Sequence, residues 1–422
     1  MPSRRLPVRP DLDQLRHQAK ELLRDVRSGG SDAIAEFRAF HPRLIEPADA
    51  RLSDAQMALA RSYGVKSWPR LVLACSLIEA IWEDRTDVVR QLITRCPRLL
   101  HENARATEKC NWGPPMSYAA NLGRDEIIET LHGLGATDHA RAMNRAVLQS
   151  RIGTARRLHE MGGRPEAPAG SLNDPAYTLS VEGTALMLEL GAQVVDGEGR
   201  RVAPVDVVLE TDSRKPEAKH AILEMYARHG LTLPDTPAMA LHRGRIDLLD
   251  AHLRRDPELL THTFSHDEIY PPEMGCHDAI LATHGTPLNG ATVLHMCVDF
   301  DEWEIANWLL ERGMDVDARA AVDGDGFGGH TALFASVVSQ PNFWTNYQRR
   351  PPEARFTQLL LHHGADPNAR ASLRKQLHPG YGEDVLHEYR DVTPLAWGRR
   401  FHRQVFVSEP AMRLIEEHGG ME

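Results

Sequence analysis

The chain has little cysteine and lacks long apolar runs. Its five cysteines, Cys75, Cys96, Cys110, Cys276 and Cys297, are scattered over 422 residues and never form a CxxC pair, which excludes a disulfide framework and a zinc ribbon. No apolar run approaches the ~18–20 residues needed to cross a bilayer. The first residues, MPSRRLPVRPDLDQ, contain no apolar signal core. We therefore expect a cytoplasmic protein that does not act at a membrane.

A net positive charge is also lacking. The chain carries 49 basic and 59 acidic side chains, a net charge of −10, which argues against a nucleic-acid-binding protein. The charge is uneven, since residues 1–74 hold 13 basic and 9 acidic side chains and are net positive. A cationic partner or a metal ion would suit the acidic remainder, although solvation of the surface alone explains both excesses.

The remaining composition is that of a folded protein. Apolar residues make up 42% and charged residues 26% of the chain, which excludes extensive disorder. At 422 residues the chain is longer than one compact core usually serves. This length indicates either two or three domains or one elongated repeat array.

Residues 1–74 predict a helical N-terminal extension. Capping residues at Asp11, Ser31, Ser53 and Ser67 each precede apolar side chains at helical spacing, and glycines at 29, 30 and 64 end the helices. From residue 75 a longer unit recurs, whose second helix ends on glycine. Such a glycine takes the left-handed conformation at a helix end. The expected ends are Gly135, Gly162, Gly191, Gly230, Gly313, Gly364 and Gly419.

Two kinds of motif resemble the ankyrin-repeat family. The family's TPLH helix start is similar to TVLH at 292–295, TALF at 331–334 and TPLA at 393–396. Its helix end and loop resemble WLLERGMDVDA at 308–318 and LLLHHGADPNA at 359–369. The resemblance implies an all-α fold, an ankyrin-type solenoid of stacked helix-turn-helix units with short hairpin fingers. It also implies that the TPLH histidine, His295, hydrogen-bonds backbone between units.

The resemblance varies along the chain. It is good over 290–420, fair over 75–165 and poor over 166–260, where we favour degenerate repeats over an unrelated helical insert. The expected organisation is a helical extension at 1–74, degenerate ankyrin-like repeats at 75–260, a loop insertion at 261–289 and clearer repeats at 290–422. The N-terminal extension contains DLDQL at 11–15, AKELL at 19–23 and SWPRL at 67–71. Through these segments it resembles an extension found ahead of such repeats in bacterial proteins, and this resemblance implies a bacterial source.

A glycine-rich segment at 324–329 formally satisfies GxGxxG. Asp323 and Asp325 would repel a pyrophosphate, and no parallel-sheet pattern surrounds the segment, so it is not a dinucleotide site. A calcium loop also fails, because Phe327 occupies the third ligand position. Within an ankyrin-like unit the segment is a hairpin finger. Simple loop flexibility is the favoured interpretation of this segment, and an exposed Phe327 that serves as a recognition tip is the alternative. Asp323, Asp325 and Phe327 are kept as candidate binding residues.

Histidine is concentrated in the 261–289 insertion. His262, His266, Cys276, His277 and His284 could ligate zinc, but Pro271 and Pro272 interrupt any helix that would align the first two. We predict no metal and no cofactor, and a polar loop that covers the inner face of the solenoid. His277 and His284 are kept as candidate binding residues of that loop.

An acidic cluster with tryptophan follows the TVLH motif. Asp299, Asp301 and Trp303 are candidate binding residues, although helical spacing prevents all of them from facing one way. His330 and Tyr389 are expected to line a groove with some of these carboxylates. No nucleophile with an attendant base is recognisable by spacing.

The favoured function is a scaffold that binds another protein through its concave face and finger loops. The alternative is a small-molecule or metal-dependent enzyme. Its pocket would lie between the 261–289 insertion, the 319–330 loop and the C-terminal repeats, because long loops often serve function.

Overall fold

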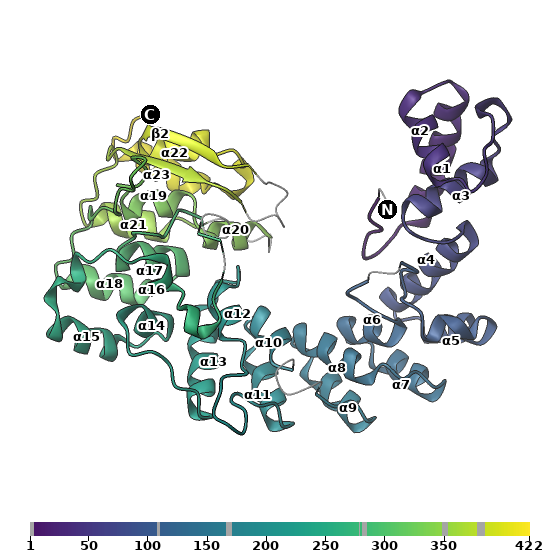
Figure 1. Ribbon diagram of the computed structural model, residues 1–422, viewed down its shortest axis with the longest axis horizontal. Coiled ribbons are helices and arrows are strands. Elements are labelled where there is room, and N and C mark those ends of the chain that lie inside the picture. Colours follow the sequence, from purple (N-terminus) through teal and green to yellow (C-terminus); the bar gives the residue numbers. More distant parts are fainter. Residues whose placement is uncertain are drawn as a thin grey trace. The chain divides into compact units, whose positions relative to one another are not determined.

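The computed structural model describes residues 4–107, 110–165, 171–277, 279–280, 285–347, 353–377 and 385–422. It is mostly helical and divides into two compact units (Figure 1). Unit 1 comprises residues 1–174 and 186–191, and unit 2 comprises residues 175–185 and 192–422. In the described part of the chain, no helix has both the length and the apolar character needed to cross a membrane.

Unit 1 begins with a three-helix bundle. Asp11 caps the first helix by accepting hydrogen bonds from two backbone N–H groups, as its position predicts. Ala19, Val26, Phe37 and Leu59 form part of the bundle's core. The third helix begins at Leu52 with Arg51 as its cap, so the predicted cap at Ser53 is wrong by two positions. The helices are α1 (Leu12–Arg27), α2 (Ser31–Phe40) and α3 (Leu52–Ser62).

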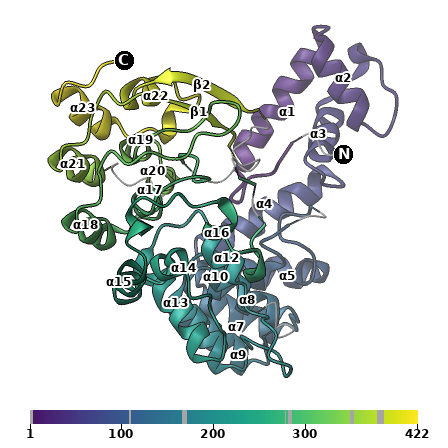
Figure 2. The ribbon, with the colours of Figure 1, turned by 60° about the vertical axis from the view of Figure 1, so that its left-hand side comes forward.

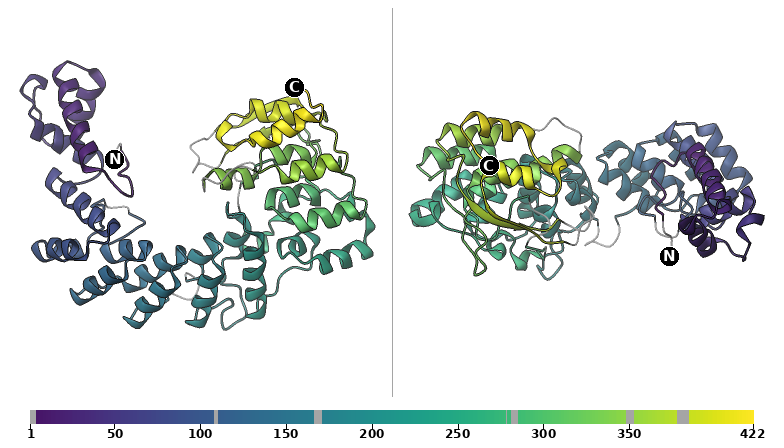
Figure 3. Two further views of the ribbon diagram at one scale, coloured as in Figure 1. Left: turned by 180° about the vertical axis from the view of Figure 1, so that it is seen from behind. Right: turned by 90° about the horizontal axis from the view of Figure 1, so that it is seen from above.

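The rest of unit 1 is a stack of helix pairs. The first helices of successive pairs, α4, α6 and α8, contact one another, and the second helices α5 and α7 do likewise (Figure 3). The expected boundary at residue 74 lies inside α4, which runs without interruption. The helices are α4 (Trp68–Trp82), α5 (Thr86–Arg95), α6 (Pro115–Leu122), α7 (Asp125–Gly133), α8 (His139–Leu148) and α9 (Ile152–Glu160).

The stretch that lacks a clear TPLH motif is also helical. Two short helices, α10 (Asn173–Tyr177) and α11 (Val181–Glu189), occupy the chain where the two units meet in sequence. Unit 2 continues with α12 (Val205–Glu210), α13 (Pro216–Arg228), α14 (Pro237–His242) and α15 (Ile246–Arg255). The insertion that follows contains α16 (His266–Ile269), which packs on α14.

The C-terminal part of unit 2 is the most regular stack. Helices α17, α19 and α22 contact in succession, and α18, α21 and α23 form the second members of the pairs (Figure 2). Thr292, Thr331 and Thr393 occupy the N-cap positions of the first helices, as the motifs predict. Among them, the Thr393 side chain accepts a hydrogen bond from the N–H of Ala396. The helices are α17 (Val293–Phe300), α18 (Trp303–Glu311), α19 (Ala332–Val337), α20 (Gln340–Tyr347), α21 (Arg355–His362), α22 (Pro394–Arg400) and α23 (Glu409–Glu417). The expected all-α ankyrin-type solenoid is confirmed.

Backbone hydrogen bonds connect the loops of successive repeats. Strands β1 (Ala371–Lys375) and β2 (His387–Val392) form an antiparallel hairpin. Gly328 bridges to Ser372 of β1, and the N–H of Ala321 donates to the carbonyl of Gly290 at 2.8 Å. Gly290 in turn donates to Phe264 at 2.7 Å. Neighbouring fingers of unit 2 therefore support one another edge to edge.

All the predicted helix-end glycines have positive φ, including Gly364 at +87°. Nothing lies within 4 Å of a Cβ built on Gly364. A larger side chain there would therefore strain the backbone, because φ is positive, but would not clash with other atoms. Replacing Gly364 by valine is therefore expected to destabilise the α21 repeat by ~1 kcal/mol or more. The free energy of opening from hydrogen exchange over α21 measures this cost. Gly133→Val is the matched control, since Gly133 is helical and equally open. An equal effect of both variants would contradict the argument from strain.

Candidate functional site

The 319–330 finger is held by its own backbone and by one aspartate. The Asp323 side chain accepts hydrogen bonds from the N–H groups of Asp325 at 2.9 Å and Phe327 at 3.0 Å. These bonds lower the pKa of Asp323. Gly328 has a φ of +123°, and a Cβ there would lie 2.0 Å from the carbonyl oxygen of Ala321. The finger therefore requires glycine at this position to bring its two strands together.

Phe327 is not an exposed recognition tip, and this alternative is wrong. Its side chain is only 4% exposed. The guanidinium groups of Arg374 and Arg390 lie over its ring, at 5.0 and 4.3 Å from the centroid. Both arginines belong to the β1–β2 hairpin, so long-range packing that local sequence does not reveal turns the phenylalanine inward.

The two finger carboxylates are paired with the same arginine. Arg374 donates to Asp323 at 2.6 Å and to Asp325 at 2.9 Å. The hydrogen bond to Asp325 is the largest cause of a raised pKa for Arg374. Because all three side chains are at least partly exposed to solvent, the pairs mainly fix the orientation of the finger against β1.

A groove of about 350 Å³ lies beside the finger. Its apolar surface includes Phe327, Leu373 and Pro287, and its polar rim includes Asp323, Arg374 and Asn289. Two of its lining side chains are large, apolar and exposed: Val322 at 61% and Ile280 at 46%. The described residues that line it include no serine, threonine or cysteine. The groove can receive an apolar side chain flanked by charge of either sign.

His330 lies in the wall of this groove and is 2% exposed. Its Nε2–H donates to the carbonyl of Pro287 at 3.0 Å. His295, in α17, donates through Nε2 to the carbonyl of His330 at 3.0 Å, and Thr292 lies 2.8 Å from its Nδ1. The predicted role of His295 in bonding backbone of the next unit is confirmed. Burial lowers the pKa of His295 to about 4 and that of His330 to about 3, so both rings are neutral.

The predicted acidic cluster does not line this groove. Asp299 is fully buried and pairs with Arg214 at 3.2 Å, which removes it from any surface that a partner could reach. Asp301 pairs with Arg355, whose guanidinium also lies 5.4 Å from the ring of half-buried Trp303. These residues tie α17, α18 and α21 together.

Sequence reasoning missed the partners of Glu302, the carboxylate between Asp301 and Trp303 in this cluster. Lys219 of α13 is 5% exposed and lies 3.0 Å from Glu302, which is 3% exposed. His220 contacts the same carboxylate at 2.9 Å. Burial alone would raise the pKa of Glu302, but these two neighbours outweigh it and hold the pKa below its usual value. Burial lowers the pKa of Lys219. The one available signal in the sequence was the position of Lys219, a charged residue within a segment of helical pattern, which could have indicated a buried ion pair.

Tyr389 also lies apart from the groove. It is 7% exposed, its hydroxyl lies 2.7 Å from Nδ1 of His402, and its ring meets Trp397 edge to face at 4.7 Å. It therefore packs β2 against α22 instead of presenting a binding surface.

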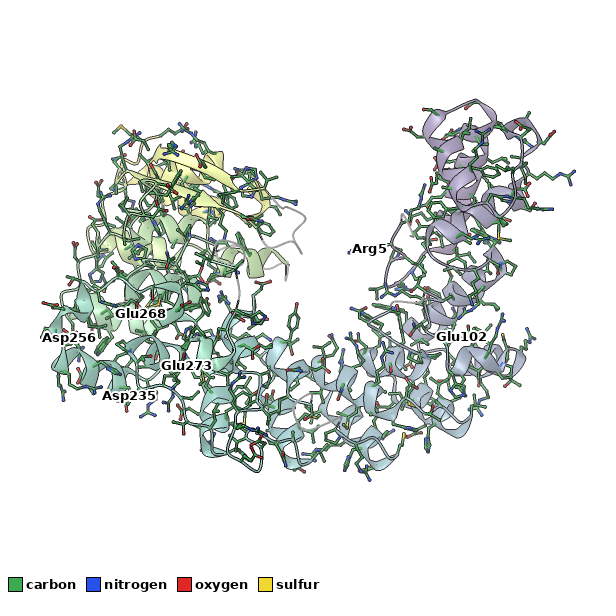
Figure 4. All side chains as sticks on the ribbon, in the orientation of Figure 1. Arg5, Glu102, Asp235, Asp256, Glu268 and Glu273 are labelled. Carbon is green, nitrogen blue, oxygen red and sulfur yellow. The ribbon has the colours of Figure 1, made fainter. Side chains whose placement is uncertain are left out.

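The histidine-rich insertion does not gather around one point. His262 is exposed and pairs with Glu268 at 3.0 Å, whereas His266 is buried. His262 and Glu268 line a second groove of about 310 Å³ together with Asp256; Figure 4 labels both acidic residues. His277 lies instead next to Glu210 of α12. His284 lies outside the described residues.

Comparisons with known proteins found one family model and similar solved structures. The ankyrin-repeat family model matches residues 289–321, which contain the TVLH motif, α17, α18 and the start of the finger. No curated protein matches the chain. Among solved structures, the human ASB11 ankyrin repeat domain is similar, with 16% identity, a TM-score of 0.28 and coverage of 73% of this chain and 99% of that one. The chain therefore contains an ankyrin repeat at residues 289–321, within a stack of helix pairs.

Proposed function

We propose that this protein is a scaffold that binds another protein through the groove beside its 319–330 finger. The observation that carries the proposal is the exposed apolar pair Val322 and Ile280 at the mouth of a groove of about 350 Å³. Large apolar side chains that remain exposed around a concavity are typical of interaction sites.

The surrounding charges define what the partner presents. Asp323, Asp325 and Arg374 lie in one ion-paired row beside the apolar surface. A partner segment with one apolar side chain flanked by polar groups of both signs fits this arrangement. Because the finger is tied to β1 and to Gly290, the groove is largely preformed, which reduces the entropy lost on binding.

Site-specific photocrosslinking tests this proposal. A benzophenone side chain placed at Val322 in the full chain is expected to crosslink a discrete partner in cell extract, and Val322→Asp should weaken capture of that partner roughly tenfold or more. Leu44 is the matched control position, since it is 92% exposed and lies in the N-terminal bundle. A probe there should not capture the same partner.

The melting temperature of Val322→Asp should equal that of the unchanged protein, because the side chain is 61% exposed. If Val322→Asp retains full capture, or if probes at Val322 and Leu44 yield the same products, the groove is not the binding surface.

A further inference from the structure

Three metal-ligating side chains converge beside α12. Asp206 and Glu210 are four residues apart on this helix and therefore share a face. His277, from the insertion, lies against that face. One ligand atom from each of the three residues lies within 4.8 Å of the other two. Two ligands bound to one zinc ion at ~2.1 Å are up to ~4.2 Å apart, so small side-chain rotations suffice to close the set.

The backbone around His277 fixes the position of this histidine. Its N–H donates to Oε1 of Glu210 at 2.8 Å, which holds the loop on the helix. The preceding turn (Pro272–Met274) ends at Gly275, which has a φ of +87°. A Cβ on Gly275 would lie 2.5 Å from Nη2 of Arg201, so glycine permits the close approach of loop and arginine. Backbone contacts of the fold therefore help to place these three side chains, of which Asp206 and Glu210 are half-buried and His277 is exposed.

The imidazole of His277 has the orientation typical of a metal ligand. Its Nδ1 lies 2.8 Å from the carbonyl oxygen of Gly275. Since a carbonyl oxygen only accepts, Nδ1 carries the proton and Nε2 carries the lone pair. Metal-binding histidines commonly donate their other ring N–H to a backbone carbonyl in this way, which fixes the tautomer.

The local charge is still suited to a cation. Asp206 and Glu210 contribute two carboxylates, and Arg201, 3.7 Å from Asp206, offsets only one of these negative charges. One nitrogen and two oxygen donors suit a transition-metal ion, whereas calcium prefers oxygen alone.

We propose that Asp206, Glu210 and His277 form a binding site for one divalent transition-metal ion of the zinc class. Three protein ligands leave further coordination positions to water or to a group from a partner. The sequence predicted no metal, and the histidines it weighed for zinc do not form the site together. Two of the ligands come from α12, about 70 residues before His277. This site is independent of the groove beside the finger.

Calorimetric titration of the chelator-treated full-length protein with zinc chloride tests the proposal. The unchanged protein is expected to bind one equivalent that Asp206→Asn and His277→Asn each weaken by ~10–100-fold or abolish. Zinc should also raise the melting temperature of the unchanged protein but not that of His277→Asn. His262→Asn is the matched control, because His262 is an exposed histidine of the same insertion that pairs with Glu268.

Two results would overturn the site. One is no zinc binding by the unchanged protein at millimolar zinc. The other is binding by Asp206→Asn and His277→Asn with unchanged stoichiometry and affinity. Because Asp206 and His277 are at least partly exposed, both variants should keep the apo melting temperature of the unchanged protein. Circular dichroism of the apo variants checks that they are folded.

Discussion

Replacing Glu302 by leucine should destabilise the α17–α18 repeat by ~3–5 kcal/mol, because it leaves a buried lysine without its carboxylate. Lys219 is 5% exposed, and its Nζ lies 3.0 Å from Glu302 and 4.7 Å from the centroid of the Phe300 ring. Without Glu302, Lys219 must either stay charged in an apolar site or lose its proton, and both cost free energy. Hydrogen exchange of the α17 and α18 amides measures the free energy of opening.

A double variant separates the pair from the packing around it. Lys219→Met combined with Glu302→Leu should recover most of the lost stability, since a buried ion pair and an apolar pair of similar volume are often comparable. His220 then loses its partner too, but its side chain is 23% exposed and can bond to water. If the double variant is as unstable as the sum of the single variants, the two side chains do not act as a pair.

The helices could be predicted because their signals are local. The capping residues Asp11, Thr292 and Thr393 and the left-handed glycines act within one turn of the chain, so their roles can be read from adjacent letters. The resemblance to ankyrin repeats then supplied the stacking order. Between residues 166 and 260 there is no clear TPLH motif, and no local signal there identified which side chains the helix stack buries.

The candidate site was predicted less well because its side chains depend on distant partners. Phe327 is covered by Arg374 and Arg390, which lie 47 and 63 positions further along the chain. Asp299 is paired with Arg214, 85 positions earlier. The glycines on either side of Phe327 predict an exposed loop, and the charge of Asp299 predicts an exposed side chain. The repeat fold instead brings arginines from other repeats onto these side chains, and a single sequence does not reveal such pairs.

Acidification should selectively loosen the repeats that contain His295 and His330. Burial lowers the pKa of these rings to about 4 and about 3, below the ~6.5 of an unfolded histidine. As the pH falls below ~6.5, these two histidines become protonated in the unfolded chain but stay neutral in the folded protein. The contribution of these neutral rings to the free energy of unfolding is therefore fully present above pH ~6.5. Below it, the free energy of unfolding falls by up to ~1.4 kcal/mol per pH unit for each ring, until the pH reaches the pKa of that ring in the folded protein.

Asparagine in place of His330 tests whether these rings cause the loss. Hydrogen exchange over α17 and α19, corrected for the intrinsic effect of pH, should show a shallower decline between pH 6.5 and ~4.5 in His330→Asn than in the unchanged protein, whatever the substitution costs at neutral pH. Buried Asp299 and Asp301 act in the opposite sense. Their folded pKa values are raised, chiefly by burial, so their protonation adds stability as the pH falls. An unchanged slope in His330→Asn would assign the acid sensitivity to groups outside the histidine pair.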